Sequence, residues 1–160
     1  MIFGYEVLRV KRSAFWPYLY DMSFEIQHAV DLIPQGIPFV FVDKLIYIDD
    51  KTSHGVFKIP AENIFVKSGF YSASGMVESM AQTAAAGTGY LSKKNHKKIP
   101  LGYIGAVQKL EVFDWPPSNA EITMEITLIT NILQVSLVSG IVKYREKVMT
   151  SCEMKIFVTN

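Results

Sequence analysis

The chain has 160 residues, of which 49% are hydrophobic and 19% are charged, and its formal net charge is +1. This length fits one domain, and the composition favours a packed core over a disordered chain. The near-neutral charge argues against nucleic-acid binding, which needs a strong basic excess. The single cysteine, Cys152, cannot form an internal disulfide, and we interpret it as a core residue of a strand.

The first residues differ in pattern from the rest of the chain. They are aromatic and basic, and charged residues interrupt the apolar ones. A signal peptide places its charges before its apolar core, which is the reverse of the order found here. A membrane-spanning helix needs about 20 consecutive apolar residues, and no apolar run in the sequence is that long. We therefore expect a cytoplasmic protein with an N-terminal extension at 1–22 and a single domain at 23–160. A further hypothesis is that translation starts at Met22, where the domain pattern begins.

The predicted elements of the domain begin with a short helix at 23–33, where apolar residues recur at helical spacing before a proline and a glycine. Residues 38–48 and 53–59 are β-branched and aromatic, so they predict the two strands of a hairpin. Residues 61–73 contain glycine and several serines and predict an irregular segment.

Residues 74–92 predict the long helix of the domain, because Met, Ala, Gln and Glu favour helices and Ser74 offers an N-cap. Its side chains are small almost all round, which suits a helix that a sheet encloses closely. After a lysine-rich turn, apolar and β-branched runs predict strands at 100–113, 119–130, 132–144 and 147–159. The layout is α+β, with the long helix packed on the one sheet.

Two motifs resemble the β-hydroxyacyl-ACP dehydratases of the hotdog fold. Residues 33–44 read Ile-Pro-Gln-Gly-Ile-Pro-Phe-Val-Phe-Val-Asp-Lys, in register with the family's Leu-Pro-His-Arg-x-Pro-Phe-Leu-Leu-Val-Asp-Arg. Residues 78–82 read Glu-Ser-Met-Ala-Gln, where the family has Glu-Ala-Met-Ala-Gln on its central helix. Residues 99–105, followed by Lys109, resemble a strand of the branch found with aryl polyene and flexirubin pigment biosynthesis. The resemblance covers about 23–159 and implies a curled antiparallel sheet wrapped around one long central helix.

The loop before the long helix departs from this family. The classical dehydratases carry a catalytic histidine there, in a Gly-His-Phe-Pro-like sequence, and residues 63–71 contain no histidine. Gln35 also replaces the histidine of the first motif, although that one is not catalytic in the family. The chain's histidines are His28, His54 and His96. None has the family position and no pair has metal-ligand spacing, so we expect no metal.

The resemblance implies that Glu78 is the catalytic carboxylate. Dehydration of a 3-hydroxyacyl thioester needs a base for the proton next to the carbonyl and an acid for the leaving hydroxyl. The family places a histidine and a carboxylic acid across a tunnel at a dimer interface. From its position alone, Glu78 is more simply explained as an ordinary first-turn glutamate that the helix dipole stabilises. With the family resemblance, the catalytic role becomes the preferred interpretation.

Further candidate substrate-binding residues surround Glu78 in the sequence. Backbone N–H groups near Ser74 and Gly75 are candidates to bind the thioester carbonyl oxygen, or they only cap the helix. Gln82, one turn beyond Glu78, either orients the carboxylate or bonds the backbone. Phe70 and Met76 are candidates to line the acyl tunnel. Alternatively, they are ordinary residues of the hydrophobic core.

The lysine-rich turn is a candidate docking patch for an acidic acyl carrier protein, formed by Lys93, Lys94, Lys97 and Lys98. Such a patch mainly speeds encounter. A solvated turn at a helix C-terminus, which prefers cations, is the alternative explanation. The phosphopantetheine arm comes with the acyl substrate, as a carrier-protein or CoA thioester, so we expect no cofactor of the protein's own.

Two functions stay open. The first is a 3-hydroxyacyl-ACP dehydratase, a lyase of fatty-acid or polyene biosynthesis. For this enzyme three routes remain. Glu78 acts as both base and acid, or a partner subunit supplies the histidine. In the third route the carboxylate activates water and the reaction is thioester hydrolysis. The second is a non-catalytic hotdog subunit that pairs with an active dehydratase, or more weakly an acyl-binding module. Hotdog sheets pair along an edge strand, so we expect a homodimer or a heterodimer with another hotdog subunit.

Overall fold

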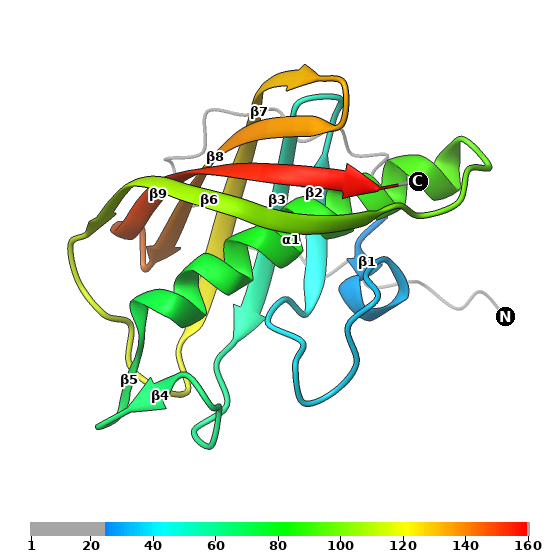
Figure 1. Ribbon diagram of the computed structural model, residues 1–160. Coiled ribbons are helices and arrows are strands. Elements are labelled where there is room, and N and C mark those ends of the chain that lie inside the picture. Colours follow the sequence, from blue (N-terminus) through cyan, green and yellow to red (C-terminus); the bar gives the residue numbers. More distant parts are fainter. Residues whose placement is uncertain (1–24, 160) are drawn as a thin grey trace, which may run out of the picture.

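The structure, a computed structural model, describes residues 25–159 (Figure 1). The expected extension at 1–22 and the hypothetical start at Met22 lie outside this range. The helical elements are α1 (Ala73–Lys94) and the short 3₁₀ helix η1 (Ala29–Asp31). The strands are β1 (Gln27–His28), β2 (Lys44–Ile48), β3 (Thr52–Lys58), β4 (Val66–Lys67), β5 (Phe70–Tyr71), β6 (Leu101–Val112), β7 (Glu121–Ile132), β8 (Val135–Tyr144) and β9 (Lys147–Thr159).

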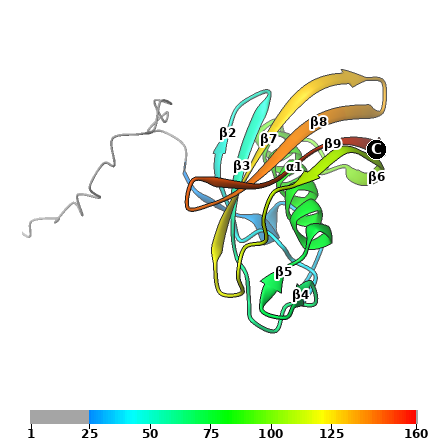
Figure 2. The ribbon, with the colours of Figure 1, turned by 90° about the vertical axis from the view of Figure 1, so that its left-hand side faces the viewer.

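One antiparallel sheet of seven strands dominates the fold, in the order β1-β2-β3-β7-β8-β9-β6. The sheet curls around α1, which crosses its concave face (Figures 1 and 2). Strands β4 and β5 form a separate small hairpin just before the helix. The predicted α+β layout, a curled antiparallel sheet wrapped around one long helix, is therefore confirmed.

Small residues let helix and sheet approach closely. A methyl group added at Gly87 of α1 would lie 2.9 Å from the Ser53 side chain of β3. A methyl group at Gly140 of β8 would lie 2.6 Å from the sulfur of Met80. The run of small helical residues in the sequence thus reflects the close contact that it predicted.

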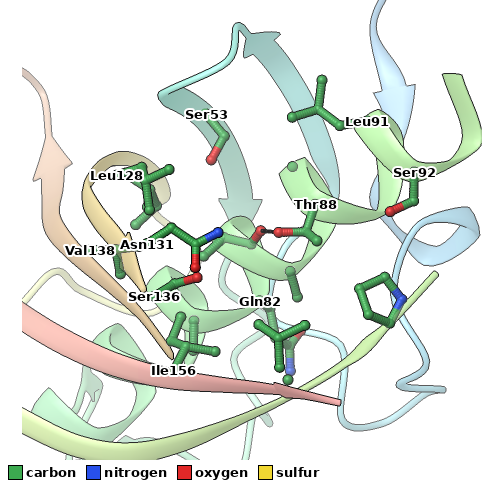
Figure 3. A pocket seen from close by; sticks show the side chains of 18 of the residues that line it. Ser53, Gln82, Thr88, Leu91, Ser92, Leu128, Asn131, Ser136, Val138 and Ile156 are labelled. Atoms are coloured by element: carbon green, nitrogen blue, oxygen red, sulfur yellow. Dashed lines mark hydrogen bonds between the residues drawn. The ribbon is translucent and has the colours of Figure 1, made fainter. Parts of the chain in front are cut away.

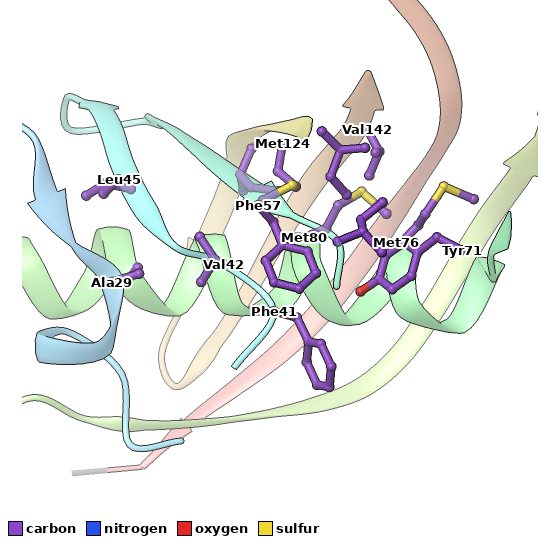
Figure 4. Packing of buried hydrophobic residues seen from close by; sticks show 14 of the residues in the cluster. Ala29, Phe41, Val42, Leu45, Phe57, Tyr71, Met76, Met80, Met124 and Val142 are labelled. Atoms are coloured by element: carbon purple, nitrogen blue, oxygen red, sulfur yellow. The ribbon is translucent and has the colours of Figure 1, made fainter. Parts of the chain in front are cut away.

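The core lies between α1 and the concave face of the sheet (Figure 4). Met76 and Met80 of the helix pack there with Met124 and Val142 of the sheet, and all four side chains are fully buried. Flexible methionines fill irregular gaps of this kind. Cys152 is also buried in the sheet, as expected, and burial raises the pKa of its thiol to about 11.

The predicted short helix at 23–33 is wrong over the residues that the structure describes. The chain forms the two-residue strand β1, which pairs with β2, and then the single turn η1. The backbone N–H of Ala29 donates to the carbonyl of Asp43 at 2.9 Å, which fastens the turn to the sheet. Ile26 and Val30, which suggested an apolar helical face, are exposed. Their spacing therefore does not reflect burial.

Candidate functional site

The N-cap of the long helix lies two residues earlier than the sequence suggested. It is Ser72, whose hydroxyl accepts a hydrogen bond from the Gly75 N–H at 3.3 Å. The prediction of Ser74 as the cap is wrong, because the Ser72 N–H bonds the Phe65 carbonyl and fastens the chain just before the helix. The first turn contains no acidic residue. Glu78 therefore lies beyond the reach of the strongest helix-dipole effect, which weakens its explanation as a dipole-stabilised glutamate.

Gly75 serves packing at this helix start. A methyl group there would lie 2.5 Å from the ring of Tyr71, and the Tyr71 hydroxyl donates to the Gly75 carbonyl at 2.9 Å. The Gly75 N–H is already bonded to Ser72. Burial raises the pKa of Tyr71 far above its usual range, so its hydroxyl remains a hydrogen-bond donor. Of the two N–H groups that we considered for the thioester, only that of Ser74 lies at an exposed residue.

Gln82 holds Glu78 and the first motif together. Its Oε1 accepts from the Phe41 N–H at 2.8 Å, and its Nε2 donates to the Phe39 carbonyl at 2.9 Å. These backbone partners fix which way the amide points. The second N–H of the same Nε2 then donates to Glu78 Oε1 at 2.9 Å. Gln82 is only 1% exposed, so a buried amide orients the half-buried carboxylate and joins the two sequence motifs in space.

A cavity of about 710 Å³ starts at Glu78 and Gln82 and follows α1 toward its C-terminal end (Figure 3). On the helix side it is lined by small residues, Ala81, Ala84, Ala85 and Thr88. On the sheet side it is lined by apolar residues, including Ile126, Leu128, Val138 and Ile156. The cavity thus offers an elongated space between helix and sheet, with a carboxylate near one end.

Phe70 and Met76, the other candidates for the tunnel wall, do not line this cavity. Met76 is fully buried in the core. Phe70 lies on β5 with its side chain half exposed, and it forms a bridge with Pro117. Met76 therefore agrees with the simpler explanation as a core residue, whereas Phe70 is not a core residue.

No histidine lines the cavity within residues 25–159. His28 and His96 are exposed. His54 stands on β3 between Ser53 and Gly55, which face the helix, so its side chain points to the opposite face of the sheet. There its ring contacts that of Tyr47, with the centroids 5.1 Å apart and the planes tilted by 40°, and burial lowers the pKa of its imidazole. The chain alone therefore provides no imidazole to the cavity, and Glu78 is the carboxylate beside Gln82; the other carboxylates that line it, Asp49 and Asp50, belong to the β2–β3 turn.

Of the four lysines of the predicted docking patch, Lys93 and Lys94 form the last residues of α1 and Lys97 and Lys98 follow it, and all are exposed. Lys93 donates to the Asp31 carbonyl at 2.6 Å, which gives it a structural contact. Lys97 lies at the rim of the cavity, and so does Lys51 of the β2–β3 turn, which no sequence motif marks. The lysines lie at the end of the cavity that is distant from Glu78.

Strand β6 is an edge of the sheet, paired on one side with β9. It is exposed along almost its whole length on both faces. Large apolar residues are among those exposed, namely Leu101, Tyr103, Ile104, Val107 and Leu110. Soluble proteins rarely leave a long apolar edge strand uncovered, because it pairs readily with another chain.

Within the part of the chain that the structure describes, no helix is long and apolar enough to cross a membrane. The same residues bring together no group of three or more His, Cys, Asp or Glu side chains that would suit a metal ion.

The curled sheet around one central helix defines a hotdog-fold protein. The family model of the ApeP-like proteins, described as ApeP dehydratase, matches residues 27–160. The chain therefore belongs to the ApeP-like family. A search of curated proteins gave no match.

Solved structures share the fold at low sequence identity. The dehydratase heterocomplex ApeI:P from Xenorhabdus doucetiae contains a chain with a TM-score of 0.78 and 14% identity, over 84% of this chain and 92% of that one. A hypothetical thioesterase with coenzyme A from Streptococcus pneumoniae TIGR4 has a TM-score of 0.58 and 9% identity, over 72% and 84%. The PaaI protein from the phenylacetic acid degradation operon of E. coli has a TM-score of 0.58 and 8% identity, over 71% and 80%.

Proposed function

We propose that this protein is a subunit of a 3-hydroxyacyl thioester dehydratase, with Glu78 as its catalytic carboxylate. The observation that carries the proposal is the position of Glu78 at the cavity, where the buried amide of Gln82 bonds one of its oxygens at 2.9 Å. The other carboxylate oxygen stays available to a substrate. Membership of the ApeP-like dehydratase family supports a reaction of this class.

The reaction needs two proton transfers. A base takes the proton from the carbon next to the thioester carbonyl, and its electron pair forms the carbon–carbon double bond as the bond to the hydroxyl breaks. In the proposal Glu78 gives its proton to that hydroxyl, which leaves as water. The N–H of Ser74, one turn before Glu78 on the same helix face, is the candidate to bind the carbonyl oxygen.

The base, in this proposal, comes from a second hotdog chain that pairs along β6. The uncovered apolar edge of β6 supports a partner there. A second copy of this chain would bring another Glu78 and no histidine in the loop at 63–71. A different hotdog chain with an intact histidine loop would complete the acid–base pair. A dehydratase heterocomplex is known among the structures that share this fold.

The second candidate function is a non-catalytic subunit that stabilises an active dehydratase. The lack of any histidine along the cavity, among the described residues, favours it. In this case Glu78 and Gln82 only fix the helix to the segment at 39–41. The carrier of the acyl group is an acyl carrier protein or CoA in either case.

Mass spectrometry of the reaction products separates these functions. The full chain, alone and co-expressed with a second hotdog chain that retains the loop histidine, is incubated with a 3-hydroxyacyl carrier-protein thioester. The proposal expects the enoyl product, lighter by one water, and its loss in Glu78→Gln but not in the exposed control Glu62→Gln. Turnover that survives Glu78→Ala rejects the catalytic role and favours the non-catalytic subunit. Release of the free acid would indicate a thioesterase instead.

A further inference from the structure

The part of the cavity distant from Glu78 contains polar side chains that the proposed reaction does not use. Ser53 comes from β3, Asn131 from β7 and Ser136 from β8, and Thr88 of α1 stands opposite. Figure 3 shows the hydroxyl of Ser53, the amide of Asn131 and the hydroxyl of Ser136 turned into the same space. None of the four belongs to a motif that the sequence analysis identified.

Ser53 is the most informative of these residues. The residue as a whole is 6% exposed, and its hydroxyl, which has no hydrogen-bond partner among the described residues, is open to the cavity. The hydroxyl of this buried residue opens into the cavity and is therefore free to bind a ligand or ordered water there. Gly87 makes room for it, because a methyl group there would lie 3.0 Å from the Ser53 oxygen.

The other three groups also have hydrogen-bonding capacity to spare. Asn131 and Ser136 are directly paired across β7 and β8, so their side chains leave the sheet side by side. Thr88 donates its hydroxyl proton to the Ala84 carbonyl at 3.1 Å, and its oxygen can still accept. All four groups are neutral. The charged residues that line this end of the cavity, Asp49, Asp50, Lys51 and Lys97, belong to the β2–β3 turn and to the segment after α1. A neutral ligand group suits the four neutral groups themselves.

The distance from Glu78 sets the length of the ligand. Gly87, beside Ser53, follows Glu78 by nine residues along α1, and the helical rise makes this about 13 Å. The helix wall between them is formed by Ala81, Ala84 and Ala85, which offer no polar side chain. An extended alkyl chain of about ten carbons spans this apolar stretch.

We infer that the cavity binds an acyl chain with a neutral oxygen-containing group, a hydroxyl or a carbonyl, near its far end, and that Ser53, Asn131 and Ser136 bind that group. The placement of the thioester at Glu78 rests on the proposed function. A pantetheine arm entering from the lysine end is the rival occupant. It fits less well, because its first amide lies close to the sulfur and would fall in the apolar stretch beside the alanines.

Isothermal titration calorimetry on the full chain tests the inference with decanoyl-CoA, ω-hydroxydecanoyl-CoA and free CoA. We expect the ω-hydroxy chain to bind about fivefold more tightly than the alkyl chain, the effect of one neutral hydrogen bond. Ser53→Ala should remove this preference, and Asn131→Leu should do so without altering a buried residue. Ser139→Ala, on β8 but on the opposite face from Val138 and Gly140, is the matched control and should retain it.

Equal binding of the two acyl probes, no binding of either, or a preference that survives both variants overturns the inference. Binding of free CoA that weakens about fivefold in Ser53→Ala would assign the polar groups to the pantetheine arm and would also overturn it. Failure of the proposed dehydratase reaction can be distinguished from failure of this inference. If the ω-hydroxy preference is found and depends on Ser53, while no enoyl product forms, then the chain-end site stands and the dehydratase role does not.

Discussion

Replacement of Gln82 by leucine tests the contact on which the candidate site depends. Gln82→Leu keeps a side chain of similar size but removes the bonds to the Phe41 N–H, the Phe39 carbonyl and Glu78. The Phe41 N–H is buried and loses its partner. The carboxylate of Glu78 loses the donor that orients it. The variant should therefore lose both folding stability and any activity that needs a fixed carboxylate.

The expected loss of stability follows from these bonds. A buried N–H left without a partner costs about 1–3 kcal/mol, and the bond to the partly buried Phe39 carbonyl is worth about 1 kcal/mol. The added burial of leucine offsets part of this. We expect Gln82→Leu to lower the free energy of unfolding by about 2–3 kcal/mol. Glu78→Gln, at a half-buried residue, should lower it by less than about 1 kcal/mol.

Urea unfolding followed by circular dichroism measures both variants against the unmodified chain. The midpoint should fall markedly in Gln82→Leu, with an unchanged slope, because the same surface is exposed on unfolding. A loss below about 1 kcal/mol in Gln82→Leu would refute the reasoning, since it would mean that water or a shifted backbone satisfies Phe41. An equal loss in Glu78→Gln would also refute it, because the stabilising contact would then be the carboxylate.

Three further predictions concern other parts of the fold. Gly89→Ala should lower the thermal midpoint in scanning calorimetry, although alanine favours helices, because the new methyl group would collide with the Leu32 carbonyl oxygen; a higher midpoint would contradict this. The Cys152 thiol, with its pKa raised to about 11 by burial, should resist a thiol reagent in the native protein at pH 8. It should react once the chain is unfolded or the pH approaches that value, and fast native labelling would show the burial to be wrong. In the complex co-expressed with the second hotdog chain, Val107→Asp on β6 should weaken association in sedimentation velocity, whereas the control Ile129→Asp on β7 should not; equal effects of the two variants would exclude the β6 interface.

The sequence predicted the long helix and the strands after it well because their determinants are local. Small helix-forming residues and β-branched runs describe these elements within a few positions of their observed ends. The false helix at 23–33 arose because apolar residues at spacings of three and four suit several conformations. Only the pairing of β1 with β2 shows that this segment belongs to the sheet.

The site was less predictable because its contacts join distant parts of the chain. Glu78 and Gln82 stand out through the family motif, but the bonds from Gln82 to Phe39 and Phe41 have no local signal. Ser53 and Asn131 could not be brought together from the sequence either. They lie on different strands, and the curl of the sheet decides that they face the same cavity.

The exposed edge of β6 has a consequence for how the protein is made in the cell. A chain without its partner presents a long row of unpaired backbone groups and apolar side chains, and such an edge recruits other chains indiscriminately. Unpaired copies are thus the ones that chaperones and proteases remove. The steady amount of this protein should then follow the supply of its partner more closely than its own rate of synthesis.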